Sequence, residues 1–129
     1  MTRRAALLLP VLLWADERID VLDAVGPLAT ALSNGDADDF MGRIPEDCPN
    51  RRELGDNIRG LLAQAEITCS IDFKRSEKGR AELDWYMQIK SRASQSVLEQ
   101  RKASVFVTLR EHAVCTIEPV DFFKPAVIP

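Results

Sequence analysis

The sequence is poor in the residues on which most metal sites and many catalytic sites depend. Its 129 residues include one histidine and three cysteines, which are too far apart in the chain to suggest a set of metal ligands. No glycine-rich phosphate-binding loop is present. The basic pair Arg51-Arg52 is too short to form a phosphate-binding cluster, and the formal net charge of -3 disfavours nucleic acid as a partner. We therefore expect no metal, no cofactor and no nucleic-acid partner.

Long hydrophobic runs are also missing. A helix needs about 20 apolar residues to span a bilayer, and the longest apolar run, from Ala5 to Trp14, is shorter. Two arginines precede this run, and an alanine and two acidic residues follow it, which is the layout of a secretory signal peptide. We predict a signal peptide over residues 1–15 and a bacterial protein that is exported, periplasmic or secreted, without a stable membrane anchor after processing. A helix packed on the domain is the alternative.

The three cysteines leave their bonding open. An odd number in an exported protein leaves one cysteine unpaired or bonded between chains. Cys69 and Cys115 alternate in phase with apolar neighbours, which favours buried side chains. Cys48 lies between Pro45 and Pro49, and we expect it to be an exposed thiol in a loop.

The first half of the chain has helical periodicity. Apolar residues recur at three- and four-residue spacing over residues 16–32, with a kink expected at Gly26-Pro27. Asp36 can cap a short second helix, and Asn50 with Glu53 has the capping-box spacing that opens a third. The residues expected to face inward from these two helices are Phe40, Met41, Ile44, Leu54, Ile58, Leu61, Leu62 and Ala65.

The second half alternates between apolar and polar residues, as half-buried strands do. The pattern predicts strands over residues 67–73, 81–90, 97–110 and 114–118, joined by short turns. One face of this antiparallel sheet is apolar and must lie on the helices. The order of helices and then strands predicts an α+β fold, with residues 16–129 as a single domain.

Several short phrases within this pattern resemble the nuclear transport factor 2-like superfamily, whose fold is called cystatin-like. They are Ala31 to Asp36 before Phe40, Asn57-Ile58-Arg59 leading into Ala65-Glu66-Ile67, and Asp84-Trp85-Tyr86 in mid-strand. The resemblance implies a cone-shaped sheet whose concave face holds the N-terminal helices. It also implies a pocket at the wide end and, in many members, a homodimer formed through the sheet.

The inner face of the cone supplies the candidate ligand site. If Trp85 points inward, Phe73, Leu83 and Met87 lie beside it, and Glu99 and Arg101 are the inward charges. Arg101 can then stack on Trp85 and bind an anionic group, so we expect a small apolar or weakly anionic ligand. The alternatives are that both charges point to water, or that a bulge resets their direction.

The outer face supplies the candidate interface. Tyr86 and Phe106 are its large side chains, and we predict that they anchor a homodimer. His112, in a predicted turn, is expected to be a solvated residue. We predict a non-catalytic module for small-molecule binding or dimerisation. A small isomerase or dehydratase of the ketosteroid isomerase-like type, using Glu99 or another acid as its base, is the alternative.

Overall fold

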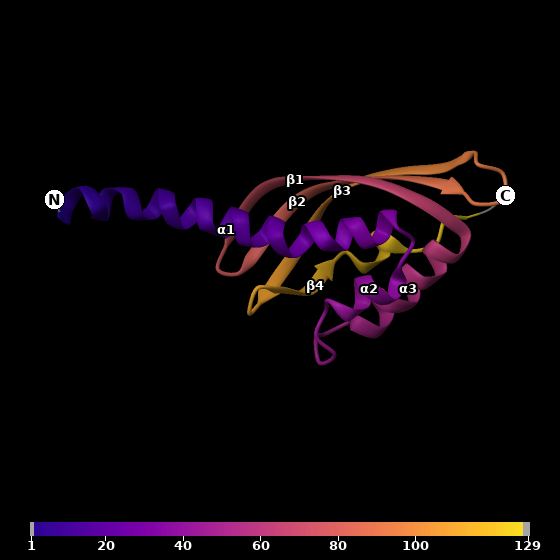
Figure 1. Ribbon diagram of the computed structural model, residues 1–129, viewed down its shortest axis with the longest axis horizontal. Helices are drawn as coiled ribbons and strands as arrows, with labels where there is room; N and C mark the ends of the chain where they lie inside the picture. Colours follow the sequence, from indigo (N-terminus) through magenta and orange to yellow (C-terminus); the bar gives the residue numbers. More distant parts are fainter. Residues whose placement is uncertain (1, 128–129) are drawn as a thin grey trace.

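The computed structural model describes the backbone of residues 2–127 and the side chains of residues 17–127. A curved antiparallel sheet arches over three helices, which all lie on its concave side (Figure 1). The fold class predicted from the sequence is confirmed. The elements in chain order are α1 (Thr2–Ser33), α2 (Ala37–Gly42), α3 (Arg51–Gln64), β1 (Ala65–Glu77), β2 (Arg80–Ser91), β3 (Val97–Arg110), β4 (Ala113–Glu118) and the 3₁₀ turn η1 (Val120–Phe123).

Helix α1 begins before the first predicted helix. Its backbone is helical from Thr2, whereas the side chains of the predicted signal peptide, residues 1–15, lie outside the described residues. Gly26-Pro27 does not interrupt the helix, which continues through both residues to Ser33, and the expected kink stays a prediction. Proline removes one backbone donor from the helix, but Val25 and Leu28 on either side are fully buried, and this packing holds the helix together. No helix within residues 2–127 is long and apolar enough to cross a membrane.

The two shorter helices begin where the sequence predicts. The Asp36 carboxylate accepts a hydrogen bond of 2.9 Å from the Asp39 amide and caps α2. The predicted capping box at α3 does not form, since Asn50 has a left-handed backbone (φ 61°) and its side chain makes no capping bond. Arg51 instead bonds the carbonyls of Met41 and Ile44 and so ties α3 to α2. The inward-facing residues predicted for α2 and α3 are all buried.

The sheet is a meander in the order β1-β2-β3-β4. The predicted strands are present, but β1 extends farther than expected at both ends, and its turn into β2 is reduced to Lys78-Gly79. Both turn residues have positive φ, as a tight hairpin requires. Inward residues of β2 are buried in strict alternation with half-buried outward residues from Ala81 to Lys90, so the predicted assignment of the two faces is confirmed.

A disulfide corrects the expectation for Cys48. Cys48 is buried and bonded to Cys115, with Cα atoms 5.4 Å apart, and it is not an exposed thiol. The register passes from the pair Thr108–Thr116 to the pair Leu109–Val114 and leaves Cys115 as the extra residue of a bulge. A bulge redirects a side chain from the regular alternation. Cys115 can therefore reach the loop between α2 and α3, although its place in the alternation suggested only a buried thiol.

Candidate functional site

The concave interior is filled at the position where the sequence suggested a ligand. Leu83, Trp85 and Met87 are fully buried, and Phe73 is half-buried. The Trp85 ring meets Phe123 edge-on at 5.2 Å between centroids and meets Phe122 at 6.5 Å. Edge-on aromatic contacts of this kind are favourable. The inward direction predicted for Leu83, Trp85 and Met87 is confirmed, but the space beside Trp85 is occupied by the chain's own aromatic side chains.

Arg101 is the only buried charged residue in the described part of the chain, and it does not point to water. Its Nη1 donates to the carbonyl oxygens of Phe122 at 2.8 Å and of Lys124 at 2.6 Å, while its Nε and Nη2 donate to the Glu99 carboxylate. The hydrogen bond from Arg101 lowers the pKa of Glu99, against a smaller opposing effect of burial. The two inward charges therefore neutralise each other and hold the C-terminal tail.

The C-terminal tail, residues 119–126, closes this end of the cone. Two side chains of α3 bind its backbone: Asn57 donates to the Val120 carbonyl at 3.1 Å, and the Gln64 amide bonds both the N–H and the carbonyl of Ala126. Gly60 lets the tail approach closely, since a Cβ there would lie 2.8 Å from the Pro125 ring. The sequence carries one signal for this closure, the adjacent aromatic pair Phe122-Phe123 near the C-terminus. Both are buried.

The single free cysteine of the described residues lies in the same interior. The Cys69 sulfur contacts the Ala29 carbonyl at 3.8 Å. Burial raises the pKa of the Cys69 thiol, an effect that contacts with Ser33 and Trp85 partly offset. The buried Trp85 Nε1 has no conventional acceptor, so a weak contact with this sulfur is the most that it obtains. A neutral thiol in this position is a poor nucleophile.

A cleft of about 250 Å³ opens beside the middle of α1, where the β1–β2 and β3–β4 turns meet the helix. Glu17 accepts a hydrogen bond of 2.7 Å from Ser76, and Asp20 Oδ1 lies 3.7 Å from His112 Nδ1. The side chains of Val21 and Leu109 form the apolar part of the cleft wall. His112 is an exposed turn residue with φ 68°, as predicted, but the sequence did not place an acid beside it. The described residues contain no group of three or more His, Cys, Asp or Glu side chains arranged to hold a metal ion.

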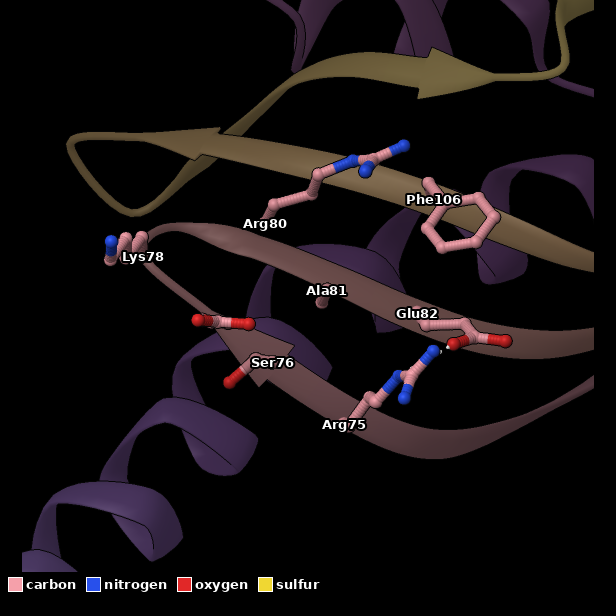
Figure 2. Close-up of a pocket in the computed structure, with 8 residues that line it drawn as sticks. Arg75, Ser76, Lys78, Arg80, Ala81, Glu82 and Phe106 are labelled. Atoms are coloured by element: carbon pink, nitrogen blue, oxygen red, sulfur yellow. Dashed lines mark hydrogen bonds and ion pairs between the residues drawn. The ribbon is translucent and has the colours of Figure 1, made fainter.

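The outer face of the sheet is not covered by any helix of the described chain (Figure 1). A hollow of about 340 Å³ lies on this face, between the β1–β2 turn and β3. Figure 2 shows the residues that line it. Arg75 donates to Glu82 at 2.8 Å, and the Arg80 guanidinium lies 4.4 Å from the centre of the Phe106 ring. Although partial desolvation acts to raise it, the pKa of Glu82 is lowered by the hydrogen bond from Arg75 and by the charges of Arg75 and Lys74.

The two aromatic residues predicted for the dimer interface both lie on the outer face. Tyr86 is paired with Lys102 across the strands, and Phe106 is paired with Glu82. They are therefore four residues apart along the strand direction, roughly 13 Å, and each borders a separate hollow. Both side chains are half-buried. The face thus carries two separate aromatic sites among charged side chains.

Comparison with known proteins identifies the fold but no specific function. No protein-family model and no curated protein sequence matches the chain. A protein of unknown function with a cystatin-like fold from Nostoc punctiforme has 9% identity and a TM-score of 0.55, over 78% of this chain and 86% of its own. A protein of unknown function from Mycobacterium tuberculosis has 9% identity and a TM-score of 0.58, over 78% and 69%. A putative polyketide cyclase from a Silicibacter species has 13% identity and a TM-score of 0.54, over 82% and 94%. The chain is therefore similar in fold to cystatin-like proteins.

Proposed function

We propose that this protein is a non-catalytic member of the nuclear transport factor 2-like superfamily that forms a homodimer through the outer face of its sheet. The observation that carries the proposal is the filled interior: Trp85 is fully buried against Phe122 and Phe123. A binding or catalytic pocket in this position needs free volume beside its polar groups. The tail occupies that volume.

The charges of the interior also argue against catalysis there. A general base needs a proton affinity near the working pH and access to its substrate. Glu99 is held ionised by Arg101, which lowers its pKa, and Arg101 is committed to tail carbonyls. Asp72 and Asp84 point to the outer face. A small apolar or weakly anionic ligand at Glu99 and Arg101 would first have to displace the tail.

The outer face supports association. It is a large uncovered surface (Figure 1) with Tyr86 and Phe106 as aromatic members and charges of both signs around them. Aromatic residues and arginine are enriched in protein interfaces. A symmetric dimer requires a surface that is complementary to itself, and a face of mixed charge meets that requirement more readily than a face of one sign.

Native mass spectrometry of the purified protein tests this proposal. We expect a dimer without additional mass, which Tyr86→Asp with Phe106→Asp converts to a monomer. Ile19→Asp is the matched control, because Ile19 is an exposed apolar residue on α1, away from the outer face. If the wild-type protein is a monomer at tens of micromolar, the proposed homodimer is wrong. If it retains a small molecule, the proposal that the tail fills the interior is wrong.

Export is a separate part of the proposal. The Cys48–Cys115 disulfide supports it, because disulfides persist mainly in oxidising compartments outside the cytosol. The N-terminal arginines and apolar run supply the addressing signal. We expect the intact mass of the protein recovered from the periplasm or medium to lack about 15 N-terminal residues. Full-length protein confined to the cytosol would contradict export.

A second candidate function is a small isomerase or dehydratase whose site is the cleft beside α1. The observation that favours it is the approach of His112 Nδ1 to Asp20 Oδ1 at 3.7 Å in a cleft with apolar walls. A carboxylate can orient an imidazole that acts as a base. Saturation-transfer NMR with a panel of small enolisable ketones tests this idea. Binding that His112→Ala abolishes would favour it, and no binding by any ketone would count against it.

A further inference from the structure

The indole of Trp85 carries the one buried side-chain nitrogen or oxygen atom of the described residues that has no hydrogen-bond partner. The ring is fully buried, so its Nε1–H cannot bond to bulk water instead. A buried donor without an acceptor costs more stability than an ordinary hydrogen bond contributes. An orphaned donor in a native structure therefore needs an explanation, and a redox role is among the known ones.

The group that this donor meets is the thiol of Cys69. Cys69 on β1 and Trp85 on β2 are diagonal neighbours on the inner face of the sheet. The two side chains are in contact, and the Ser33 side chain reaches the same thiol from α1. The Cys69 sulfur also lies 3.8 Å from the Ala29 carbonyl oxygen. Because a thiol sulfur is only a weak acceptor, it leaves the indole donor unsatisfied.

Cys69 is open to small molecules but has no second thiol beside it. The residue is half-buried, so a molecule as small as hydrogen peroxide can approach its sulfur from solvent. The chain has three cysteines, and Cys48 and Cys115 are bonded to each other. An oxidised Cys69 therefore has no free thiol in its own chain with which to condense to a disulfide.

We propose that Cys69 is a site of oxidation by hydroperoxides and that the Trp85 indole holds the resulting sulfenic acid. The Cys69 thiolate attacks one peroxide oxygen, so that an S–O bond forms while the O–O bond breaks. The other oxygen leaves as hydroxide or alkoxide and takes up the proton that the thiol released. The sulfur loses two electrons, and the peroxide gains them. The new oxygen is a better acceptor than sulfur and gives the Trp85 N–H the partner that it lacks.

The position favours persistence of the product over speed of its formation. Burial raises the pKa of the Cys69 thiol, and only the thiolate reacts, so oxidation is slow at neutral pH and faster as the pH rises. Once formed, the sulfenic acid is hydrogen-bonded and isolated from other thiols. This site goes beyond the proposed homodimer and does not depend on it, because Cys69 lies on the opposite face of the sheet from Tyr86 and Phe106.

Dimedone, which labels sulfenic acids and not thiols, tests the proposal on the full chain with its disulfide intact. The protein is treated with hydrogen peroxide, the peroxide is removed with catalase, and dimedone is added after a delay. We expect one adduct, located on Cys69 by peptide mass spectrometry, and none in Cys69→Ala. Trp85→Phe keeps an aromatic ring but removes the N–H, and should retain about fivefold less sulfenic acid, the ratio that one ordinary hydrogen bond gives. No adduct on Cys69, or equal retention in Trp85→Phe, overturns the proposal.

NMR of the indole N–H in the wild-type protein gives a second reading that needs no change at Trp85. A hydrogen bond to oxygen moves this proton resonance downfield and slows its exchange with water. We expect peroxide to produce this shift for Trp85 in the wild type and not in Cys69→Ala. If Cys69 is oxidised while the Trp85 resonance stays unchanged, the indole does not hold the sulfenic acid and the proposal is wrong.

Discussion

The two faces of the sheet differ in what covers them, although the same strands supply both. On β2, Leu83, Trp85 and Met87 point into the cone and are fully buried. Their neighbours Asp84 and Tyr86 point outward and stay half-buried beside hollows filled by nothing in the described chain. The inner face is completed by this chain's own helices and tail. The outer face is left uncovered by the described residues (Figure 1).

The difference also shows why a cystatin-like fold does not by itself indicate an enzyme. The fold provides a cone, but here the tail enters it and Arg101 binds the tail's carbonyls. Two of the residues that the sequence suggested for a ligand, Glu99 and Arg101, are thus bonded within the chain itself. Function depends on the site that a fold carries, and in this chain the accessible features lie on the outside of the cone.

The largest expected effect comes from removing the central inner side chain. Trp85→Ala should lower the free energy of unfolding by about 3 to 5 kcal/mol, because it leaves a cavity in a packed core. Gln88→Ala, at a half-buried outward residue of the same strand, should lower it by less than about 1 kcal/mol. Urea unfolding at one protein concentration measures both, since the stability of a dimer depends on concentration. Similar losses from the two variants would contradict the contrast between the faces.

The next largest effect on stability is expected from removing the Cys48–Cys115 disulfide, which joins the α2–α3 loop to β4. Cys48→Ser with Cys115→Ser should cost about 2 to 4 kcal/mol, because the bond closes a loop of 67 residues and restricts the unfolded chain. Thermal unfolding with and without reductant gives the same comparison in the wild type. Cys69→Ser is the control, because Cys69 forms no disulfide. Insensitivity of the wild-type transition to reductant would show that the bridge does not stabilise the fold.

A smaller effect on stability is expected when the contacts of Arg101 with the C-terminal tail are removed. Arg101→Met keeps the length of the side chain but removes the donors to Phe122 and Lys124, and a hydrogen bond to a charged group is worth about 2 kcal/mol. Hydrogen exchange of the amides in residues 120–126 should therefore accelerate. Lys102→Met, one residue along and exposed on the outer face, should leave that exchange unchanged. Equal exchange in both variants would mean that Arg101 does not hold the tail.

The smallest expected effect is a dependence of the unfolding free energy on pH through Glu99. The pKa of Glu99 is lowered from its ordinary value of 4.5 by the hydrogen bond from Arg101. Its stabilising contribution is therefore complete above the unfolded-state pKa and is lost as the pH falls through the lower folded-state value. The difference in unfolding free energy between the wild type and Glu99→Gln should shrink from about pH 5 to about pH 3. A difference that stays constant over this pH range would show that the ionisation of Glu99 does not stabilise the fold.

Much of the fold follows from local pattern. The spacing of Asn50 and Glu53 placed the start of α3, the period of the apolar residues gave the bounds of β3, and the alternation along β2 assigned Trp85 and Tyr86 to opposite faces. The sequence suggested that Arg101 lies beside Trp85, but the register of β2 and β3 pairs Arg101 with Met87 and Trp85 with Ala103. One local expectation failed, since the Asn50 side chain makes no capping bond at the start of α3. Gly26-Pro27 does not end α1, because packing outweighs the intrinsic preference of a few residues.

The sequence by itself determined the order of helices and strands and the direction of most side chains, because periodicity is a property of neighbouring residues. Only the tertiary structure decided that Cys48 bonds Cys115, that Arg101 binds the tail and that the cone is closed. These contacts join residues 67 and 21 positions apart, and the first depends on a bulge that shifts the alternation by one residue. Pairings at such distances depend on how the elements pack together, which no local pattern specifies.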